Sequence, residues 1–396
     1  MNTVYSLGVD VSKRKVSYEW LDETGQCHGR GSVPTSQGGL RQLLEQLSAP
    51  AGAVWVVLEA TGVLHLSWAE AFHQRGYPVL VLNPLLSKRL YATANAIRDH
   101  KTDAVDAHTL AEIGRLHKAE LQRFRYQPEP ARFGLQRLAS VRQQLRQSLT
   151  NLKKNYASLL DVVFPELSAL VNVQRLDVRR LLQQASSPAA IARLPWPRLQ
   201  SCFRSQAEAV LSAARSSLAP TALAQATQPA FLAALQGLEA LEAQLAQVDA
   251  QQQALLPQVL ASTQIALART VPGIGPKTAV AILAELPASL WQKGGRRQIA
   301  AALQALMGND PRLRESGQYR GQTKMSKRGS PSLRTGFFQA TFCATTSDPE
   351  FQQRYRTYRT RGKQHKVAIS HLMRILARRL VAVLVSGRPY ETIYAT

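Results

Sequence analysis

Four acidic residues in the first third of the chain have the types and the order that metal-dependent phosphoryl transfer requires. Asp10 ends an apolar run in GVDVSK, and Glu59 ends another in LEATG. Asp103 and Asp106 follow, three residues apart, in KTDAVDAHTL. Two divalent cations about 4 Å apart need several carboxylates to neutralise them and to fix their geometry. The four residues together therefore predict a metal site.

Each of these carboxylates also has a purely structural interpretation when it is taken alone. Asp10 is then a turn residue, Glu59 is a strand end, and the two later acids cap a helix. A helix that begins at Asp103 places Asp106 on the same face, close to the positive end of the helix dipole. Strand-end acids followed by a DxxD helix, in a chain with only 26 Asp and Glu, favour the metal site.

The elements that must position these acids alternate between strands and helices from Val4 to about Leu116. The segments VYSLGVDV and VSYEW predict two strands, and a third short strand follows the turn-like DETGQ. A helix around residues 40–47, the strand AVWVVLE, a second helix, the strand PVLVLN and further helices come next. A three-strand meander followed by alternating helices and strands predicts a ribonuclease-H-like α/β domain.

The middle of the chain, roughly residues 132–256, has a helical pattern and few glycines. Apolar residues recur every three or four positions over 138–159, and nearly so over 235–248. Two such stripes predict a helical hairpin or bundle within one chain, or a coiled coil that joins two chains. The segment SSPAAIARLPWPRLQ breaks the pattern with three prolines, and we expect it to turn the chain at the far end of this arm.

A glycine-hinged turn opens the last part of the chain, which we treat as a separate domain that ends in a helix from about Val367. In VPGIGPKTAVAIL, Gly273 and Gly275 precede a helix and Lys277 adds a cation, as in helix-hairpin-helix elements. Such a turn leaves backbone N–H groups available to a DNA phosphate. Close packing of the helix is an equally good explanation of the two glycines.

The chain is strongly basic, and the charge is concentrated near the C-terminus. Its 49 Lys and Arg against 26 Asp and Glu give a net charge of +23. Residues 312–366 alone hold thirteen Lys and Arg against three Asp and Glu, with Tyr319, Tyr355 and Tyr358 available for stacking. Such an imbalance repels itself without an anionic partner, so we expect nucleic acid here. The expected contacts are Gly273, Gly275, Lys277, Arg314, Arg320, Lys324, Lys327, Arg328 and Arg334.

Composition excludes several other classes of protein. The best membrane candidate, ILARRLVAVLV, contains Arg378 and Arg379, and the N-terminus has no secretory leader. Cys27, Cys202 and Cys343 are too few and too far apart for a disulfide framework or a zinc site. We expect a soluble, cytoplasmic, nucleoid-associated protein without a membrane partner.

The basic segment also contains candidate nucleophiles. A serine hydroxyl attacks phosphorus when cations or metals stabilise the developing charge and a neighbouring group takes its proton. Ser316 lies among arginines in DPRLRESGQYRGQTKMSKRGSPSLR. From composition alone, Ser326, Ser330 and Ser332 are equally plausible.

The motifs GVDVSK, LEATG and KTDAVDA resemble the DEDD motifs of bacterial insertion-sequence transposases of the IS one-ten and IS eleven-eleven group, relatives of the Piv DNA invertases. The resemblance extends over nearly the whole chain. It implies a fold like the RuvC Holliday-junction resolvase for residues 1–120, with Asp10, Glu59, Asp103 and Asp106 as ligands of Mg²⁺ or Mn²⁺. A helical coiled-coil region over 121–260 and a mainly α C-terminal transposase domain with a helix-hairpin-helix-like element over 261–396 complete the expected architecture.

The stretch SGQYRGQTKMSKRGSPSLR resembles the C-terminal signature of that family, in which the serine before a glycine is the recombination nucleophile. Carried over to this chain, the role falls on Ser316. This sequence departs from the family just before the motif, where WQKGGRRQ and GNDPR replace a smooth apolar helix and a Gly-Leu-x-Pro turn.

The resemblance implies a transposase that cuts, exchanges and rejoins DNA strands. It further implies a bridge RNA encoded by the element, which pairs with donor and target DNA, and at least two protomers, as a dimer or tetramer. Three alternatives remain: a site-specific DNA invertase, a junction-resolving nuclease in which water is the nucleophile, and a non-catalytic nucleic-acid-binding protein whose acids are structural.

Overall fold

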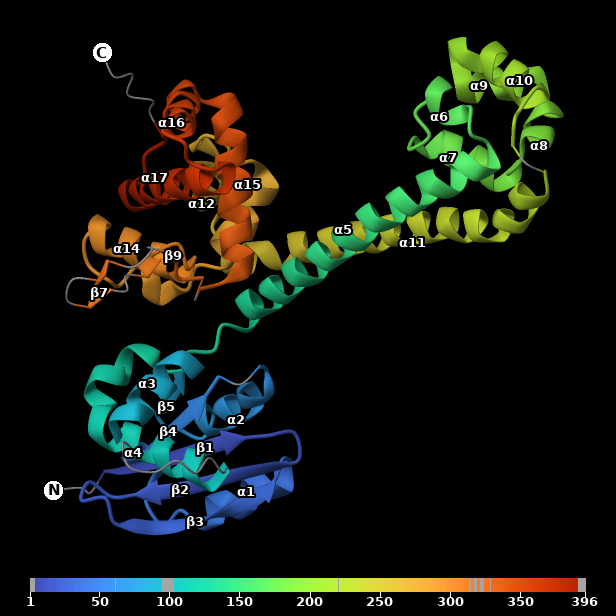
Figure 1. Cartoon of the computed structure of the whole chain (residues 1–396). Helices are drawn as coiled ribbons and strands as arrows, with labels where there is room; N and C mark the ends of the chain where they lie inside the picture. Colours follow the sequence, from blue (N-terminus) through green and yellow to red (C-terminus); the bar gives the residue numbers. More distant parts are fainter. Residues whose placement is uncertain are drawn as a thin grey trace. The chain divides into compact units, whose positions relative to one another are not determined.

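The computed structural model of the chain describes residues 4–60, 62–94, 103–219, 221–312, 315–316, 319–320, 324–327 and 329–390 (Figure 1). The chain divides into two compact units, Met1–Glu129 and Pro130–Thr396, which we call the N-terminal and C-terminal units. Each unit has hydrophobic clusters of its own. None of the helices formed by the described residues is long and apolar enough to cross a membrane.

A five-stranded mixed sheet forms the centre of the N-terminal unit. Its strands are β1 (Tyr5–Val11), β2 (Lys15–Leu21), β3 (Cys27–Pro34), β4 (Val54–Glu59) and β5 (Val79–Leu82). The order is β3-β2-β1-β4-β5, with antiparallel pairing in the β1–β2–β3 meander and parallel pairing of β4 with β1 and with β5. The predicted meander and the two later strands are confirmed, and the mixed sheet is compatible with a ribonuclease-H-like domain.

Helices cover both faces of this sheet. They are α1 (Gln37–Glu45), α2 (Leu64–His73), α3 (Pro84–Ala94) and α4 (Asp103–Leu121), with short 3₁₀ turns η1 (Ala51–Ala53) and η2 (Gln122–Phe124). Val9 and Leu58 belong to the cluster that packs with α1 and α2, whereas Val57 and Leu80 pack with Leu110 of α4. Successive side chains of a strand point to opposite faces. The sheet is therefore apolar on both sides, as the near-continuous apolar runs of β1, β4 and β5 predict.

Two glycines allow α4 to lie directly on β1. A Cβ atom on Gly8 would lie 2.0 Å from the backbone oxygen of Ala107, and one on Gly114 would lie 2.2 Å from Ser6 Oγ. Ser6, Gly8 and Asp10 share one face of β1 because the strand alternates with period two. Gly114 of α4 lies at Ser6, and Ala107, two turns earlier in the helix, lies at Gly8. The start of α4 therefore continues along β1 toward Asp10. The first turn of α4 is thereby directed to the end of β1.

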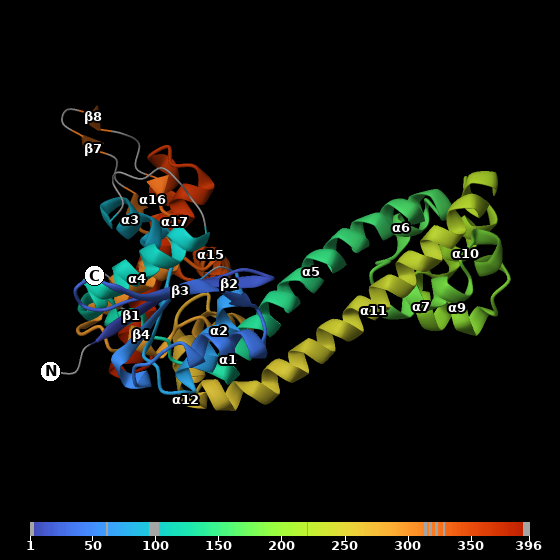
Figure 2. The same ribbon diagram turned by 90° about the horizontal axis from the view of Figure 1, so that it is seen from below.

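Two long helices form the arm of the C-terminal unit. They are α5 (Pro130–Val163) and α11 (Thr221–Val259), which lie side by side in both views (Figures 1 and 2). Arg142 pairs with Asp249, and, further along α5, the ring of Tyr156 stacks on that of Phe231 at 5.6 Å. Partners thus move backward along α11 as α5 advances, so the pair is antiparallel. The predicted hairpin within one chain is what the structure contains, while the coiled-coil interpretation remains a prediction.

A cluster of short helices, here called the head, joins α5 to α11. It consists of α6 (Leu167–Leu170), α7 (Leu176–Gln184), α8 (Pro188–Ala192), α9 (Trp196–Phe203), the 3₁₀ turn η3 (Arg204–Gln206) and α10 (Ala207–Arg215). The sequence predicts only a turn at SSPAAIARLPWPRLQ. The segment does lie where the chain reverses between α5 and α11, but it is helical rather than a plain turn, because it forms α8 and most of α9, each with a proline in its first turn. A proline there loses no helical hydrogen bond, so it begins a helix rather than breaking one.

The rest of the C-terminal unit is mainly helical. It contains α12 (Ser262–Thr270), α13 (Pro276–Ala284), η4 (Ala288–Leu290), α14 (Arg296–Leu306), α15 (Pro331–Ser347), α16 (Pro349–Thr360) and α17 (His365–Ser386), with the two-residue strands β6 (Pro311–Arg312), β7 (Glu315–Ser316), β8 (Tyr319–Arg320) and β9 (Lys324–Met325). The predicted terminal helix is confirmed as α17. Its Leu372, Leu376 and Leu380 are fully buried with Phe337 and Phe351.

Side-chain caps define where two of these helices begin. Ser330 Oγ accepts a hydrogen bond from the Leu333 N–H at 3.1 Å at the start of α15. Asp348 Oδ1 accepts one from the Phe351 N–H at 2.9 Å at the start of α16. Each cap satisfies a backbone donor that the first turn of a helix leaves unpaired.

The predicted three-domain division at residues 120 and 260 remains a prediction.

Candidate functional site

The two strand-end carboxylates, Asp10 and Glu59, are neighbours at one edge of the sheet. In the parallel pair of β1 and β4, Val9 is the register partner of Leu58. One residue further along each strand lie Asp10 and Glu59, on the face opposite to Val9 and Leu58, which is the face that α4 covers. Both residues are half-buried. Two acids that are 49 positions apart in the sequence are thus brought to adjacent backbone positions.

Helix α4 supplies the other two predicted acids at its N-terminal end. Asp103 and Asp106 lie in its first turn, and both are half-buried. Asp103 Oδ2 accepts a hydrogen bond from Lys15 Nζ at 2.9 Å, and Lys15 begins β2 in the hairpin that follows Asp10. This ion pair, together with the contact of Ala107 on Gly8, places the first turn of α4 at the same sheet edge. The structure therefore brings all four predicted acids to one region of the N-terminal unit.

A buried serine that the sequence analysis missed holds Glu59. Ser87 Oγ, on α3, donates a hydrogen bond to Glu59 Oε2, and the residue is 5% exposed. The same hydroxyl lies 3.2 Å from the Pro84 carbonyl oxygen. Because α3 starts directly after β5, its first turn reaches the edge where the parallel strands end. A polar residue one turn after a strand of a parallel pair is the signal that could have identified Ser87.

A second polar pair lies beside the first turn of α4. His108 Nδ1 is 3.0 Å from Glu19 Oε1, and Glu19 is 7% exposed in β2. On β2, Glu19 is the register partner of Gly8, the residue on which α4 rests. The pair therefore ties α4 to the sheet two residues after Asp106. Sequence reasoning offered no indication of it, because the two partners are 89 positions apart.

The donor set at this edge suits a hard divalent cation, because carboxylate oxygens are the ligands that Mg²⁺ and Mn²⁺ prefer. One of these carboxylates, Asp103, already forms an ion pair with a cation, the Lys15 ammonium. Within the described part of the chain, no three Asp, Glu, His or Cys side chains are arranged closely enough to ligate one ion. The residue types suit a divalent cation, whereas the side chains of the described residues are not arranged around one in this structure.

Ser316, the predicted nucleophile, belongs to the C-terminal unit, whereas the four acids belong to the N-terminal unit. It ends β7, which pairs with β8 in a short antiparallel hairpin where Ser316 is the register partner of Tyr319. Two of the other candidate serines have structural partners. Ser326 Oγ donates to Asp310, and Ser330 Oγ donates to Glu285 at 2.8 Å in addition to capping α15.

The turn before α13 is explained in part by packing. Gly273 has φ +78°, and a Cβ atom there would lie 2.0 Å from the backbone oxygen of Ala340 on α15. Only glycine tolerates both the left-handed conformation and the close approach. At Gly275, the N-cap of α13, an added Cβ would contact nothing within 4 Å. Lys277 Nζ pairs with Asp249 of the arm at 3.2 Å. DNA contact by this turn remains a prediction.

The remaining predicted basic contacts have different surroundings. Arg334 Nη1 donates to the Met307 carbonyl at the end of α14, at 2.9 Å, which is a structural role. Lys327 is exposed and has φ +54°. Arg320 lies in β8 and Lys324 in β9. Arg314 and Arg328 lie outside the described residues.

Comparison with known proteins identifies the family. A family model for DEDD transposases of the IS110 type, described as a transposase, matches residues 7–165. A second model, described as the transposase IS116/IS110/IS902 family, matches residues 265–356. The chain is also similar to an insertion element IS110 uncharacterized 43.6 kDa protein from Streptomyces coelicolor, at 26% identity over 397 residues that cover 98% of this chain and 95% of that relative.

The two family models match the two parts of the chain that hold the predicted chemistry. The first includes all four acids, and the second includes Ser316 and the basic segment around it. The relative from Streptomyces coelicolor aligns with both parts and with the arm between them. The chain therefore belongs to the IS110 family of DEDD transposases, enzymes that process DNA during the recombination of insertion sequences.

Proposed function

We propose that this transposase cuts and rejoins DNA with Mg²⁺ or Mn²⁺ ions held by Asp10, Glu59, Asp103 and Asp106. The observation that supports this most directly is the adjacency of Asp10 and Glu59 on two parallel strands, under the helix that carries the other two acids. When bound, the ions would polarise the scissile phosphate and stabilise charge on the attacking and leaving oxygens.

The residues around the acids orient them for this role. Ser87 donates to one oxygen of Glu59, Oε2, and this hydrogen bond orients the carboxylate. The N-terminal end of α4 is the positive end of the helix dipole, which favours the negative charges of Asp103 and Asp106. Lys15 pairs with Asp103 in the structure and would give way to an ion of higher charge. Each contact restricts how a carboxylate can turn, and thereby lowers the entropic cost of assembling the site.

Ser316 is the proposed nucleophile. Its Oγ forms a bond to the DNA phosphorus while the bond from phosphorus to the leaving DNA oxygen breaks, and the hydroxyl proton passes to a carboxylate of the acidic site. The leaving oxygen takes up a proton and becomes the free strand end. Rejoining is the reverse reaction with a hydroxyl of the new strand. The phosphoserine ester conserves the bond energy, so no nucleotide cofactor is required.

The proposal includes a composite site, formed within one chain or between two, because the acids and Ser316 belong to different units. Strand exchange needs two cleavage sites, so a dimer or tetramer is the expected active form, with the α5–α11 arm as the expected contact. The net charge of +23 supports a large polyanionic partner, which includes DNA and a structured guide RNA.

The decisive experiment is to trap the covalent intermediate. Full-length protein is incubated with Mg²⁺ and a labelled DNA that carries the element ends, quenched in denaturant, digested and mapped by mass spectrometry. We expect a nucleotide attached to Ser316, and no adduct when EDTA replaces Mg²⁺.

The matched variants are Ser316→Ala and Ser332→Ala. Ser332 is the better control because Ser326 and Ser330 have structural partners. Loss of adduct and rejoining in Ser316→Ala alone supports the proposal. Normal cleavage by Ser316→Ala would overturn it and assign a nuclease in which water attacks the phosphate.

A further inference from the structure

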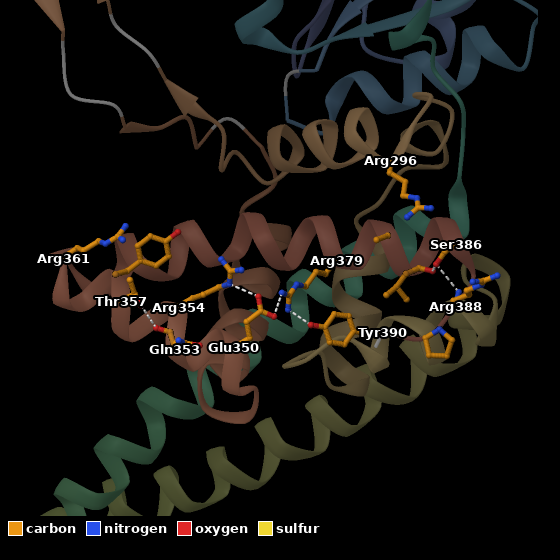
Figure 3. Close-up of a pocket in the computed structure, with 14 residues that line it drawn as sticks. Arg296, Glu350, Gln353, Arg354, Thr357, Arg361, Arg379, Ser386, Arg388 and Tyr390 are labelled. Carbon is orange, nitrogen blue, oxygen red and sulfur yellow. Dashed lines mark hydrogen bonds and ion pairs between the residues drawn. The ribbon is translucent and has the colours of Figure 1, made fainter. Parts of the chain in front are cut away.

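The lining of an arginine-rich pocket in the C-terminal unit includes neither the four acids nor Ser316. The pocket has a volume of about 840 Å³ and lies between α16, α17 and the chain that follows α17 (Figure 3). Its arginines come from four segments: Arg296 from α14, Arg354 and Arg361 from α16 and its C-cap, Arg379 from α17, and Arg388 from the chain after it. Glu350 is the one acid in the lining.

The pocket keeps a large positive charge after its internal ion pairs are counted. Glu350 pairs with Arg354 at 2.8 Å and with Arg379 at 2.5 Å. Arg296, Arg361 and Arg388 have no carboxylate within ion-pair distance among the residues that the structure describes, and all three are exposed. Figure 3 shows Arg361 and Arg388 on opposite sides of the Glu350–Arg379 pair. A concave site with this excess of guanidinium groups attracts an anion.

One of the arginines is held rigidly. The guanidinium of Arg379 lies 4.9 Å from the ring centroid of Phe351 and 5.3 Å from that of Tyr390, and it donates to the Tyr390 hydroxyl and to Glu350. Tyr390 is itself anchored, because its N–H donates to Thr270 Oγ1 at 2.8 Å. Because these contacts already fix Arg379, a ligand that binds it loses little affinity to the ordering of this side chain.

The lining also includes two aromatic rings, of which Tyr358 stacks on His371 at 5.1 Å and Tyr390 lies 5.3 Å from the Arg379 guanidinium. Tyr358 and Tyr390 line the pocket together with Val383 and Pro389. Aromatic faces beside guanidinium groups are how proteins hold unstacked nucleotides, with the base on the ring and the phosphate on the cation. The volume is in the range of small-ligand sites, about 300–1,000 Å³, which admits one or two nucleotides and is too small for a duplex.

We propose that this pocket binds a phosphodiester-linked, unpaired nucleotide of the nucleic acid that the transposase handles. DNA with an extruded nucleotide and a single-stranded RNA segment share this chemistry. Arg361, Arg379 and Arg388 lie beyond residue 356, where the second family-model match ends, whereas Arg296, Glu350 and Arg354 lie within it. The site requires neither the metal ions nor Ser316, so binding there is measured independently of strand cleavage.

Fluorescence anisotropy on the full-length protein tests this site in EDTA, where no cleavage occurs. The probes are fluorescein-labelled octamers of deoxythymidine and of uridine, an abasic DNA octamer and a blunt DNA duplex. The pocket variant is Arg361→Glu with Arg388→Glu. The control is Arg356→Glu with Arg378→Glu, which makes the same charge change at two exposed arginines of α16 and α17 that do not line the pocket.

We expect the pocket variant to lose about tenfold or more in affinity for the single strands, and the control to lose less than about threefold. Duplex and abasic probes should be weakened similarly by both variants. The ratio of the deoxythymidine and uridine affinities then distinguishes DNA from RNA as the source of the nucleotide. Equal losses of single-strand affinity in the two variants would overturn the proposal, because they would indicate general charge attraction.

Cross-linking provides a second readout that does not depend on substitution. Octamers containing 5-iodouracil are irradiated with the wild-type protein, and the modified peptides are mapped. Adducts at Tyr358 or Tyr390 support the pocket, and adducts found only at other residues contradict it. Inorganic pyrophosphate serves as a competitor without a base. If it competes as strongly per phosphate as the octamer does, the proposal is contradicted, because the aromatic lining would then contribute nothing to binding.

Discussion

Asp10 and Glu59 stand side by side on two parallel strands, one residue beyond the register pair Val9 and Leu58. Parallel strands in an open α/β sheet end at a common edge, and ligands bind there because loops and helix N-termini meet at that edge. In this protein the first turn of α4 and the start of α3 meet the same edge, bringing Asp103 and Ser87 to it. The geometry of one strand pair thus decides where the predicted acids meet.

Neutralising either strand-end acid should abolish strand cleavage without removing DNA binding. We expect Asp10→Asn and Glu59→Gln to lower the cleavage rate by about 10³-fold, since metal stabilisation of the transition state accounts for several kcal/mol. Cleavage of labelled element-end DNA in Mg²⁺ measures the loss, and anisotropy in EDTA measures binding. Glu45→Gln, at an exposed acid of α1, is the control and should cleave normally. Full activity in both site variants would mean that the acids are structural.

Ser87 is expected to act as a positioning residue through Glu59. Ser87→Ala removes the hydroxyl that orients the carboxylate, and such supporting contacts are worth about 10–100-fold in metal affinity or activity. The Mg²⁺ concentration for half-maximal cleavage should rise, while the rate at saturating Mg²⁺ should change less. Ser87→Thr keeps the hydroxyl and should restore most of the affinity. An unchanged Mg²⁺ dependence in Ser87→Ala would show that the hydrogen bond only packs α3.

The close approach of α4 to β1 predicts that Gly8 cannot be replaced. In Gly8→Ala the new Cβ would lie 2.0 Å from the backbone oxygen of Ala107, so α4 must move. Overpacking of this kind costs about 1–3 kcal/mol, and moving α4 also displaces Asp103 and Asp106. Urea unfolding measures the loss of stability. Gly52→Ala, where an added Cβ meets nothing within 4 Å, is the matched control. Equal stability of the two variants would contradict the described packing.

The Glu350 ion pairs predict a pH-dependent contribution to stability. Hydrogen bonding from Arg379 is the main cause that lowers the pKa of Glu350 from its ordinary value of 4.5, against the opposing effect of burial, and Arg354 adds to it. A lowered folded-state pKa means that the stabilisation is complete above pH 4.5 and is lost as the pH falls below it. We expect Glu350→Gln to lower the unfolding midpoint by about 4 °C at pH 7.

The same comparison at low pH tests the cause. As the pH falls through the lowered pKa, wild-type Glu350 becomes neutral, and the difference in midpoint between the two proteins should disappear. Paired thermal scans at pH 7, 5 and 3 measure this difference. A difference that stays constant down to pH 3 would show that the substitution acts through packing rather than through charge.

The sequence by itself was sufficient for most strands and long helices, because these depend on residues close together in the chain. The apolar runs before Asp10 and Glu59 predicted the strands and their ends, because a buried strand leaves a continuous apolar pattern. The three- and four-residue spacing in 138–159 predicted helix α5 for the same reason. At the Pro188 segment local pattern was misleading, since a proline in the first turn of a helix and one in its interior look alike until the boundary is known.

Only the tertiary structure decided which distant residues meet. Three contacts depend on packing between segments that are 28 to more than 100 residues apart in the chain. They are the hydrogen bond from Ser87 to Glu59, the contact of Glu19 with His108, and the pairing of α5 with α11. The arginine pocket is the clearest case, because Arg296, Arg354, Arg379 and Arg388 show no common pattern along the chain. Their proximity follows from how α14, α16 and α17 bury their apolar faces on one core. Burial of those faces is a property of the whole fold, and the positions of the charged groups at their margins follow from it.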